Sequence, residues 1–356
     1  MKQRGWPPFE NTFVDQTPPT ICMVVGFGLG YAPDMSVGDM ARHVSAAERR
    51  GYDMGFFSET LNLLRDGITT LSAFVLSTKR MRVGATQIVR LRSPVTMAQT
   101  IATLDELSEG RTVFALGACT SSHAKRHGLE PQDPATSLRE YFQVIRMLLA
   151  GGPVSFEGES VRLEEVGLSF QPKRSRVKLW VASTSRTGLQ IAGAIGDGVL
   201  LNAITSPEYS RNAVSIVRKS AEEAGRNPNE IEVAQLIVSA VSKSHEESMD
   251  SVRYEVANKF TPWQAPFNVW PKIRVGEPAI KQEDLPRFSE AYREGGYEKL
   301  MSVMPESYLV GMTASGTREE ALGRLEQYRR AGVSLPIVRP ATTGMLEPVL
   351  ETFATK

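Results

Sequence analysis

The sequence predicts an α/β fold of the (β/α)8 type, a TIM barrel, and two observations carry that prediction. Short apolar runs alternate with amphipathic segments along nearly the whole chain, and eight of the runs have the character of buried strands. Nearly all of them are followed by a helical pattern, which is the order of parallel strands joined by crossover helices. No break in composition divides the 356 residues, so one barrel domain over residues 1–356 is favoured over a doubly wound sheet.

The clearest repeat unit lies at residues 94–117. Apolar residues recur at helical spacing from Pro94 to Leu107, and Gly110 stands where a glycine commonly ends a helix. The apolar run Val113–Leu116 follows directly and finishes in Gly117. A helix that feeds a buried strand through a short turn is half of a βα repeat.

The other elements are expected in the same alternation. Strands are expected at residues 21–26, 52–58, 82–88, 113–117, 177–182, 198–201, 232–241 and 336–339. Helices are expected at residues 37–50, 67–78, 94–108, 136–149, 187–195, 207–224, 246–259, 285–294 and 318–331, before a last short helix.

Two segments are expected to be insertions into the barrel. Residues 153–165 alternate apolar and polar side chains around Gly158, which predicts a small hairpin outside the core. Residues 261–286 are rich in proline and tryptophan and have no clear period. They are either packed surface or an apolar lid built from Trp263, Phe267 and Trp270, and the lid is the interpretation we favour.

Composition excludes several classes of function. Lys plus Arg is 41 and Asp plus Glu is 40, so no excess charge points to nucleic acid or to an anionic membrane. No run reaches the length of apolar residues that a membrane span needs, and no secretory signal pattern is seen. The two cysteines, Cys22 and Cys119, form no disulfide framework and fit a reducing compartment. We therefore expect a cytoplasmic enzyme with a small-molecule substrate.

The glycine-rich segment Gly26–Gly30 invites a dinucleotide-binding interpretation. That fingerprint requires a third glycine or alanine at position 31, which is tyrosine here, and Pro33 delays the helix that should receive the pyrophosphate. We expect instead a flexible loop on the C-terminal rim of a barrel, after the first strand.

The histidines do not predict a metal site. His123 and His127 are four residues apart, but a zinc site needs a third ligand, and no His-Glu-x-x-His pattern is present. His123 follows the fourth expected strand, so it is either a donor to substrate or cofactor or an exposed loop residue.

Two further residues close expected strands. Cys119 would need a neighbouring base or a helix N-terminus to become a reactive thiolate, so packing against a ligand is the favoured interpretation. Glu59 closes the second strand, where it is either a solvated carboxylate or a group that bonds a ring or acts as a base.

The strongest local signal is the run from Ala182 to Gly188. A strand ends here in Ser183, Thr184 and Ser185, and Arg186 opens the next helical pattern. The free amides of a helix N-terminus beside an arginine suit a phosphate group. Serine and threonine are also ordinary N-caps, so the position on the rim of a barrel is what favours the phosphate.

Several phrases taken in order resemble the luciferase-like monooxygenase superfamily across nearly the whole chain. They lie at residues 92–98, 104–111, 115–117, 138–140, 156–158, 182–188 and 195–199. The chain is most similar to the deazaflavin-dependent branch typified by methylenetetrahydromethanopterin reductase. The resemblance implies a TIM barrel with insertions that is often a homodimer, and it implies either coenzyme F420 or FMN as the cofactor.

The resemblance also implies the residues of the site. The phosphate would lie at residues 183–186, and the ring would rest over residues 85–87, where many relatives carry a non-prolyl cis peptide bond. The residues expected to bind the cofactor are Thr86, Gln87, Gly117, Ala118, Cys119, Thr120, Ala182, Ser183, Thr184, Ser185 and Arg186. The candidate catalytic residues are Glu59, Thr60 and His123.

The chain departs from its relatives at two of these positions. Deazaflavin relatives usually end the second strand in Asp-His, and this chain has Glu59 and Thr60. Sugar-phosphate dehydrogenases of the branch place a glutamate where this chain has Thr120. Both departures suggest a different substrate, or a mechanism that depends on hydride transfer and positioning.

Three functions follow as hypotheses. The first is an F420-dependent oxidoreductase that moves a hydride between C5 of the deazaflavin and a small organic substrate. The second is an FMN-dependent monooxygenase that uses a partner reductase. The third is a member of the family without catalysis that carries a cofactor or serves as a structural dimer.

Overall fold

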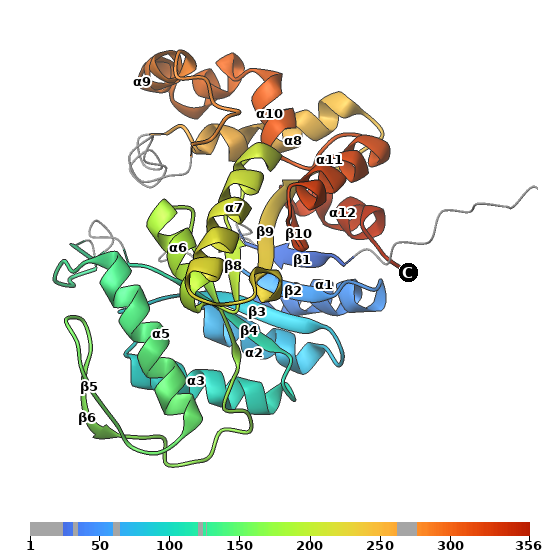
Figure 1. Ribbon diagram of the computed structural model, residues 1–356. Coiled ribbons are helices and arrows are strands. Elements are labelled where there is room, and N and C mark those ends of the chain that lie inside the picture. Colours follow the sequence, from blue (N-terminus) through green and yellow to red (C-terminus); the bar gives the residue numbers. More distant parts are fainter. Residues whose placement is uncertain (1–23, 31–34, 60–64, 120–123, 126, 262–275) are drawn as a thin grey trace, which may run out of the picture.

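Eight parallel strands close into a barrel in the order β1-β10-β9-β8-β7-β4-β3-β2 (Figure 1). The computed structural model describes residues 24–30, 35–59, 65–119, 124–125, 127–261 and 276–356. The barrel strands are β1 Gly26–Leu29, β2 Met54–Phe57, β3 Arg82–Ile88, β4 Thr112–Gly117, β7 Lys178–Ala182, β8 Gly198–Leu201, β9 Glu232–Ser239 and β10 Leu335–Pro340. The predicted (β/α)8 barrel is therefore confirmed.

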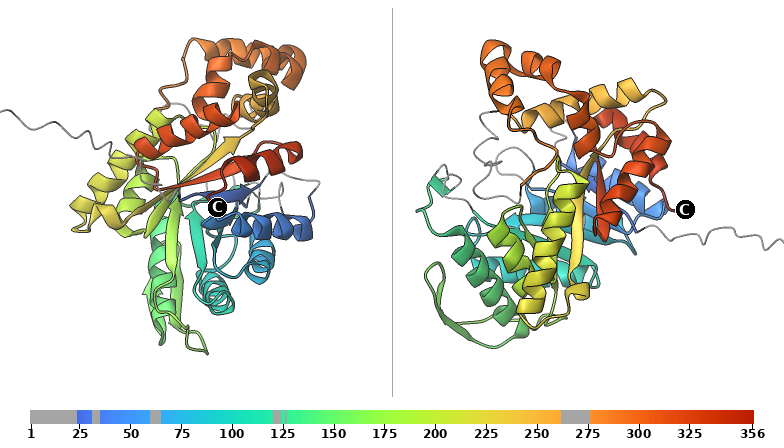
Figure 2. Two further views of the ribbon diagram at one scale, coloured as in Figure 1. Left: turned by 90° about the vertical axis from the view of Figure 1, so that its right-hand side faces the viewer. Right: turned by 45° about the horizontal axis from the view of Figure 1, so that its top comes forward.

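Helices cover the outside of the barrel and one of its ends. They are α1 Val37–Arg49, α2 Gly67–Ser77, α3 Pro94–Leu107, α5 Pro134–Ala150, α6 Arg186–Ile195, α7 Pro207–Glu223, α8 His245–Asn258, α9 Asp284–Val303, α10 Glu306–Met312, α11 Arg318–Arg330 and α12 Leu346–Thr352. Three of them, α8, α9 and α10, gather in one layer at the top of Figure 1, and Figure 2 shows the same layer from two other sides. No helix among the described residues is long and apolar enough to cross a membrane.

The glycine-rich segment is the first strand and not a loop after it, which corrects the prediction. Strand β1 spans Gly26–Leu29 and pairs with β2 and β10. A Cβ atom on Gly26 would lie 2.9 Å from Ile337 Cγ1, and one on Gly28 would lie 3.0 Å from Ile337 Cγ2. The glycines are needed because the side chain of Ile337 from β10 already fills the barrel interior beside them.

Aromatic side chains fill the centre of the barrel. Phe56 of β2 and Trp180 of β7 stack with their ring centroids 6.3 Å apart, and both are fully buried. Glycines stand next to them: a Cβ on Gly84 would lie 3.0 Å from the Phe56 ring, and one on Gly198 only 2.5 Å from Trp180 Cδ1. Small residues on β3 and β8 therefore make room for the large ones on their neighbours.

The N-terminal end of the barrel is closed by an ion pair between β3 and β9. Arg82 donates two hydrogen bonds to the carboxylate of Glu232, at 2.9 and 2.8 Å, and Lys178 Nζ lies 3.7 Å from the same carboxylate. Side chains alternate along a strand, so these inward residues fix which positions face the interior at the other end.

Charged residues in several of the phrases shared with the family hold the loops to the barrel. The carboxylate of Glu140 on α5 accepts hydrogen bonds from the amides of three consecutive residues, 159–161, at 2.8 to 2.9 Å. Asp105 on α3 binds the guanidinium of Arg174. Arg111 donates to the backbone carbonyls of Val75, Thr78 and Met81. These contacts hold the loops and helices of this chain to its barrel.

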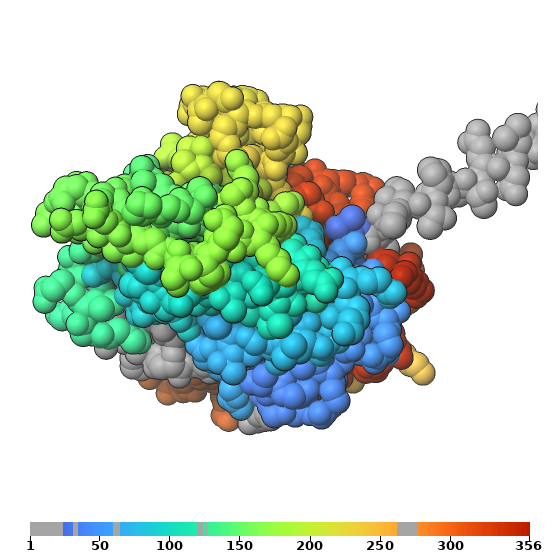
Figure 3. Space-filling model, turned by 90° about the horizontal axis from the view of Figure 1, so that it is seen from below, coloured from blue at the N-terminus to red at the C-terminus, as the bar shows by residue number. Residues whose placement is uncertain are grey.

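A two-stranded antiparallel sheet lies outside the barrel. It consists of β5 Val154–Glu157 and β6 Arg162–Val166, and the Glu140 carboxylate binds the turn between them. In Figure 3 the green segment that contains this hairpin lies on the surface beside the blue-green segment of α3 and β4. Three aromatic residues of the predicted lid, Trp263, Phe267 and Trp270, lie outside the described residues.

Helix α9 extends beyond its predicted end at Glu294. Gly295 and Gly296 interrupt it with non-helical angles, φ being +60° at Gly296, and the helix then resumes to Val303. The glycine pair that follows the predicted end is a kink, and buried Leu300 lies in the second half of the helix. Helix α10 was not predicted, because its seven residues are too few to show a period. At the remaining predicted elements the boundaries differ by no more than two residues.

Gly198→Ala tests the packing of the barrel interior. The added methyl group would collide with the buried Trp180 ring, so we expect a loss of about 1–3 kcal/mol in the free energy of unfolding, measured in urea. Gly323→Ala on α11 is the matched control, because nothing lies within 4 Å of its Cβ position, and it should gain about 0.5–1 kcal/mol. Equal effects of the two changes would contradict this description of the interior.

We expect His245 to make the attachment of the α8–α10 layer dependent on pH. Its Nδ1 lies 3.0 Å from both carboxylate oxygens of Glu320 on α11, and its Nε2 lies 3.2 Å from Glu306 on α10. The hydrogen bonds to Glu320 and then to Glu306 raise the pKa of His245 above its ordinary value of 6.5. The bridge therefore stabilises the fold fully below that value, and its contribution is lost as pH rises through the raised pKa.

We expect the melting temperature of the wild type to exceed that of His245→Asn at about pH 6, and the difference to shrink toward about pH 9. A difference that stays constant over this range would show that the charge of His245 makes no contribution.

Candidate active site

The predicted site residues that the structure describes gather at the C-terminal ends of neighbouring strands. Gly117 of β4 pairs in register with Ile88 of β3 on one side and with Ala182 of β7 on the other. Thr86 and Gln87 pair with Ala115 and Leu116, just before Gly117, and Gly117 lies beside Ala182, where the run to Arg186 begins. Thr60, Thr120 and His123 lie outside the described residues.

Small residues form the floor at this end of the barrel. Trp180 faces the interior, so by alternation Ala182 faces it too, and Gly117 lies next to Ala182 at the same level. A Cβ atom on Gly117 would meet nothing nearer than 3.7 Å. A flat group could therefore approach the backbone of β4 and β7 closely. All peptide bonds of the described residues are trans, including those of β3.

The turn from β7 into α6 is shaped by two serines. Ser185 is the N-cap and accepts a hydrogen bond from Gly188 N at 3.1 Å, while Ser183 Oγ accepts one from Ser185 N at 3.1 Å. A Cβ on Gly188 would lie 2.0 Å from Ser183 Oγ, so only glycine fits beneath this turn. Behind the turn, Tyr209 on α7 donates to Thr184 O at 3.1 Å.

The start of α6 offers donors to an anion. Among the described residues, the amides of Arg186 and Thr187 have no acceptor, and both side chains are exposed. Free amides at the positive end of a helix, with a guanidinium beside them, bind phosphate and carboxylate groups.

Glu59 is held within a network on the outer side of β2. Its Oε1 accepts a hydrogen bond from Gly67 N at 3.1 Å, and its Oε2 accepts one from Gln87 Nε2 at 3.2 Å. Arg92 lies 3.7 Å from the same oxygen and donates to Gln87 Oε1 at 2.6 Å. The Glu59 side chain is 8% exposed, and this burial raises its pKa, against the opposing effects of the Gly67 amide and the Arg92 charge.

The network fixes the end of β3 as well. Thr86 Oγ1 accepts a hydrogen bond from Glu59 N at 2.5 Å, and the side chain of Gln87 bonds the Glu59 carboxylate. Glu59 thus joins the start of α2 to Thr86 and Gln87, two of the three residues of β3 that were predicted to lie under a cofactor ring.

Cys119 is fully buried. Burial raises the pKa of its thiol, and the nearby charge of Arg90 opposes this only in part. A raised thiol pKa disfavours the reactive thiolate, so packing against a ligand stays the favoured interpretation of Cys119.

Sequence reasoning missed two polar groups at this end of the barrel. The side-chain atoms Ser58 Oγ and Arg90 Nη1 are buried, and the described part of the chain gives them no hydrogen-bond partner. Ser58 directly follows β2 and Arg90 lies two residues beyond β3. Their closeness to predicted strand ends was the available signal, but a serine or an arginine there is common.

A buried ion pair was also missed. Arg339 of β10 donates to Glu255 of α8 at 2.9 Å and to Gly30 O at 3.4 Å, and both charged side chains are almost fully buried. It fastens α8 to the C-terminal ends of β10 and β1.

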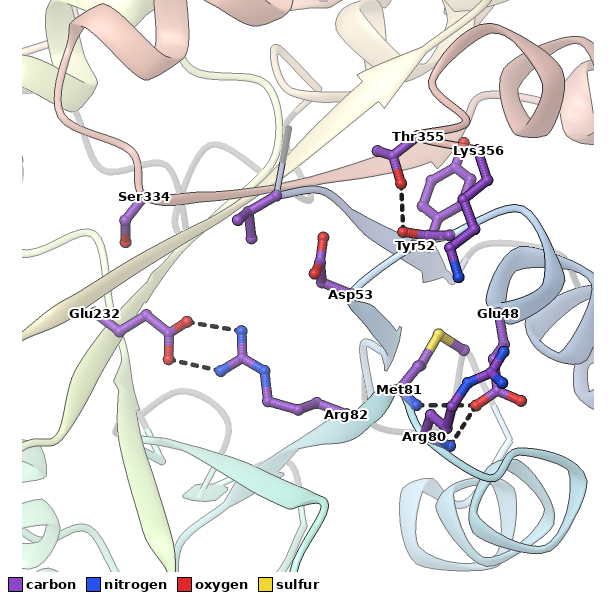
Figure 4. A pocket seen from close by; sticks show the side chains of 12 residues that line it. Glu48, Tyr52, Asp53, Arg80, Met81, Arg82, Glu232, Ser334, Thr355 and Lys356 are labelled. Carbon is purple, nitrogen blue, oxygen red and sulfur yellow. Dashed lines mark hydrogen bonds and ion pairs between the residues drawn. The ribbon is translucent and has the colours of Figure 1, made fainter. Parts of the chain in front are cut away.

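A cavity of about 700 Å³ lies at the opposite end of the barrel, and Figure 4 shows its lining. Its walls include Asp53 and Arg82 at the starts of β2 and β3, and the last residues of the chain, Thr355 and Lys356. Barrel enzymes place their chemistry at the C-terminal ends of the strands, so size alone does not make this cavity the active site.

Comparison with known proteins identifies the family. Residues 20–335 match the model of the luciferase-like monooxygenase family, so the chain belongs to that family. It is similar to the 5,10-methylenetetrahydromethanopterin reductase of Methanopyrus kandleri, with 27% identity over 332 residues that cover 88% of this chain and 92% of the relative. It is also similar to the F420-dependent glucose-6-phosphate dehydrogenase of Nakamurella multipartita, with 27% identity over 240 residues that cover 64% of this chain and 70% of the relative.

Solved structures share the fold. The coenzyme F420-dependent tetrahydromethanopterin reductase from Methanopyrus kandleri superimposes with a TM-score of 0.79 at 23% identity, covering 93% of this chain and 98% of that one. A long-chain alkane monooxygenase superimposes with a TM-score of 0.71 at 16% identity, covering 89% and 82%. With its named relatives, this chain is an oxidoreductase.

Ser58→Ala tests whether the unpaired hydroxyl of Ser58 contributes to the stability of the fold. Because Ser58 Oγ has no partner in the described structure, we expect its removal to leave the free energy of unfolding unchanged or to raise it. Ser210→Ala is the matched control, since the buried Ser210 hydroxyl donates to Gln235 at 2.6 Å, and its loss should cost about 1 kcal/mol or more. Equal losses in chemical denaturation would show that Ser58 has a partner within the protein.

Proposed function

We propose that the protein is a coenzyme F420-dependent oxidoreductase that transfers a hydride between C5 of the deazaflavin and a small organic substrate. The observation that carries the proposal is the floor of small residues at the ends of β4 and β7, directly beside the start of α6 with its unpaired amides. A flat ring and a phosphate need these two surfaces side by side. Relatives named for F420-dependent reactions support this cofactor over FMN.

Each group of residues has a part in this proposal. Ser183, Thr184, Ser185 and Arg186 would hold the phosphate through the helix start and the guanidinium. Gly117, Ala118, Cys119 and Ala182 would leave space for the ring, and Thr86 and Gln87 would support its other side.

The hydride chemistry belongs to the cofactor, and the protein binds, orients and excludes water. Glu59 would act mainly by position, because its carboxylate already bonds Gly67 and Gln87. Thr60 and His123 stay predictions as catalytic residues. The homodimer and the cytoplasmic location that the sequence suggested also stay predictions.

Titration of the purified protein with F420 and with FMN tests the proposal. We expect F420 to bind, with a change in its fluorescence, and FMN to bind far more weakly. Tight binding of FMN without affinity for F420 would replace this proposal by the FMN-dependent monooxygenase. Binding of neither would favour a member of the family without catalysis.

Arg186→Ala tests the phosphate assignment in the same titration. Loss of a charge-assisted contact to the phosphate should weaken the binding of F420 about tenfold. Arg218→Ala is the control, because Arg218 is also an exposed helical arginine but lies on α7, away from the turn. If the Arg186 variant binds F420 as tightly as the wild type, the assignment of the phosphate to the start of α6 is wrong.

A further inference from the structure

The side chain of Arg90 is half-buried, and the described structure leaves one nitrogen of its guanidinium unpaired. Its Nη2 donates to Glu130 O at 2.5 Å, whereas its Nη1 is buried without a partner in the described structure. The backbone of Arg90 is also strained, since its φ is +73°, a region that residues other than glycine rarely adopt. Vacant buried donors and strained backbones both cost free energy, and they are most often retained at functional sites.

Arg90 lies at the end of the barrel where the C-terminal ends of the strands lie, just after β3. The residue before it, Val89, donates from its amide to Gly117 O at 3.0 Å, which joins this turn to the end of β4. The guanidinium lies close enough to Cys119 and to the Tyr141 hydroxyl to affect the pKa of both. Cys119 follows Gly117 and Ala118, which lie next to the β7 strand end and its serines.

Other arginines at the barrel are better satisfied. Arg111 donates to four acceptors, and Arg82 makes two hydrogen bonds to Glu232. Within the described structure one further arginine has a vacant buried nitrogen, Arg329 at its Nε, and it contacts Val24 O at the other end of the barrel. Arg90 therefore differs from the other arginines in two ways together: its Nη1 is unpaired, and it lies among the predicted cofactor-binding residues.

We propose that Arg90 is a cofactor-binding residue, and that its Nη1 donates to an anionic oxygen of the phosphate-bearing chain of the cofactor. The hydrogen bond to Glu130 O would hold the guanidinium in place before the cofactor arrives. The phosphate would then lie between Arg90 on one side and the start of α6 on the other, across the ends of β3, β4 and β7. This inference rests on the proposed function only in that the ligand is a phosphorylated flavin or deazaflavin.

The experiment compares cofactors with and without the phosphate. Dissociation constants are measured by fluorescence for Arg90→Met, Arg90→Lys and the wild type, with F420 and with its phosphate-free deazaflavin core. We expect Arg90→Met to weaken F420 binding about 10- to 100-fold and to leave the binding of the phosphate-free core unchanged. Arg90→Lys, which keeps the charge, should recover part of the loss.

Arg329→Met is the matched control. It removes an arginine with the same kind of vacancy at the distant end of the barrel, so the affinity for F420 should not change. Thermal unfolding of each variant without ligand checks that it is folded. Arg90→Met removes the hydrogen bond to Glu130 O together with the unpaired donor, so we expect only a small loss of stability.

The other outcomes overturn the inference. Unchanged F420 affinity in Arg90→Met would show that the vacant donor has no ligand. An equal loss for both ligands would assign Arg90 to the ring or to the fold and not to the phosphate. If the wild type binds FMN and not F420, the proposed function fails, and FMN with riboflavin then supplies the same comparison for Arg90.

Discussion

Closure of the barrel is the constraint on which the rest of the structure depends. Eight strands enclose a fixed interior volume, and each large side chain must find a small one on the neighbouring strand. Phe56 and Trp180 occupy the centre, and Gly84 and Gly198 stand beside them. This packing fixes the inward face of every strand, and with it which residues face the interior where the strands end.

The helices and loops are fastened to this barrel by buried or half-buried charges. Asp105, Arg111 and Glu140 bind backbone amides, backbone carbonyls or an arginine, and each belongs to a phrase shared with the family. They do not distinguish a deazaflavin from a flavin, because none of their contacts lies at the ends of the strands where a cofactor would bind.

Much of the fold could be predicted because its signal is periodic and local. The helix at residues 94–107 and the strand at residues 82–88 show their apolar spacing and their glycine or serine boundaries directly. The first strand was predicted at residues 21–26 and lies at Gly26–Leu29. Its position could not be recognised, because its glycines are determined by Ile337, more than 300 residues away. The helix predicted at residues 285–294 was too short for a related reason, since its continuation beyond Gly295 and Gly296 depends on the burial of later residues such as Leu300.

The candidate site was predictable only as far as strand ends are predictable. Ser183, Thr184 and Ser185 stood out because a strand, hydroxyl residues and a helix start follow one another in the sequence. The states of Glu59 and Arg90 depend on three-dimensional neighbours: Gln87 and Arg92 surround the first, and Glu130 holds the second. The sequence alone cannot show that the Glu59 carboxylate has its hydrogen bonds made whereas the Arg90 guanidinium has an unpaired donor. The first stabilises a loop, and the second leaves a donor for a ligand.

Within the described residues, the polar groups at the N-terminal end of the barrel are largely paired, as Arg82 and Glu232 are, whereas Ser58 and Arg90 have unpaired atoms at the C-terminal end. Arg329 is the exception at the N-terminal end, so an unpaired buried donor suggests a ligand only where its position in the barrel also does. An unpaired donor beside a floor of small residues and a helix start with free amides indicates a group to which a bound cofactor would supply the missing hydrogen-bond partner.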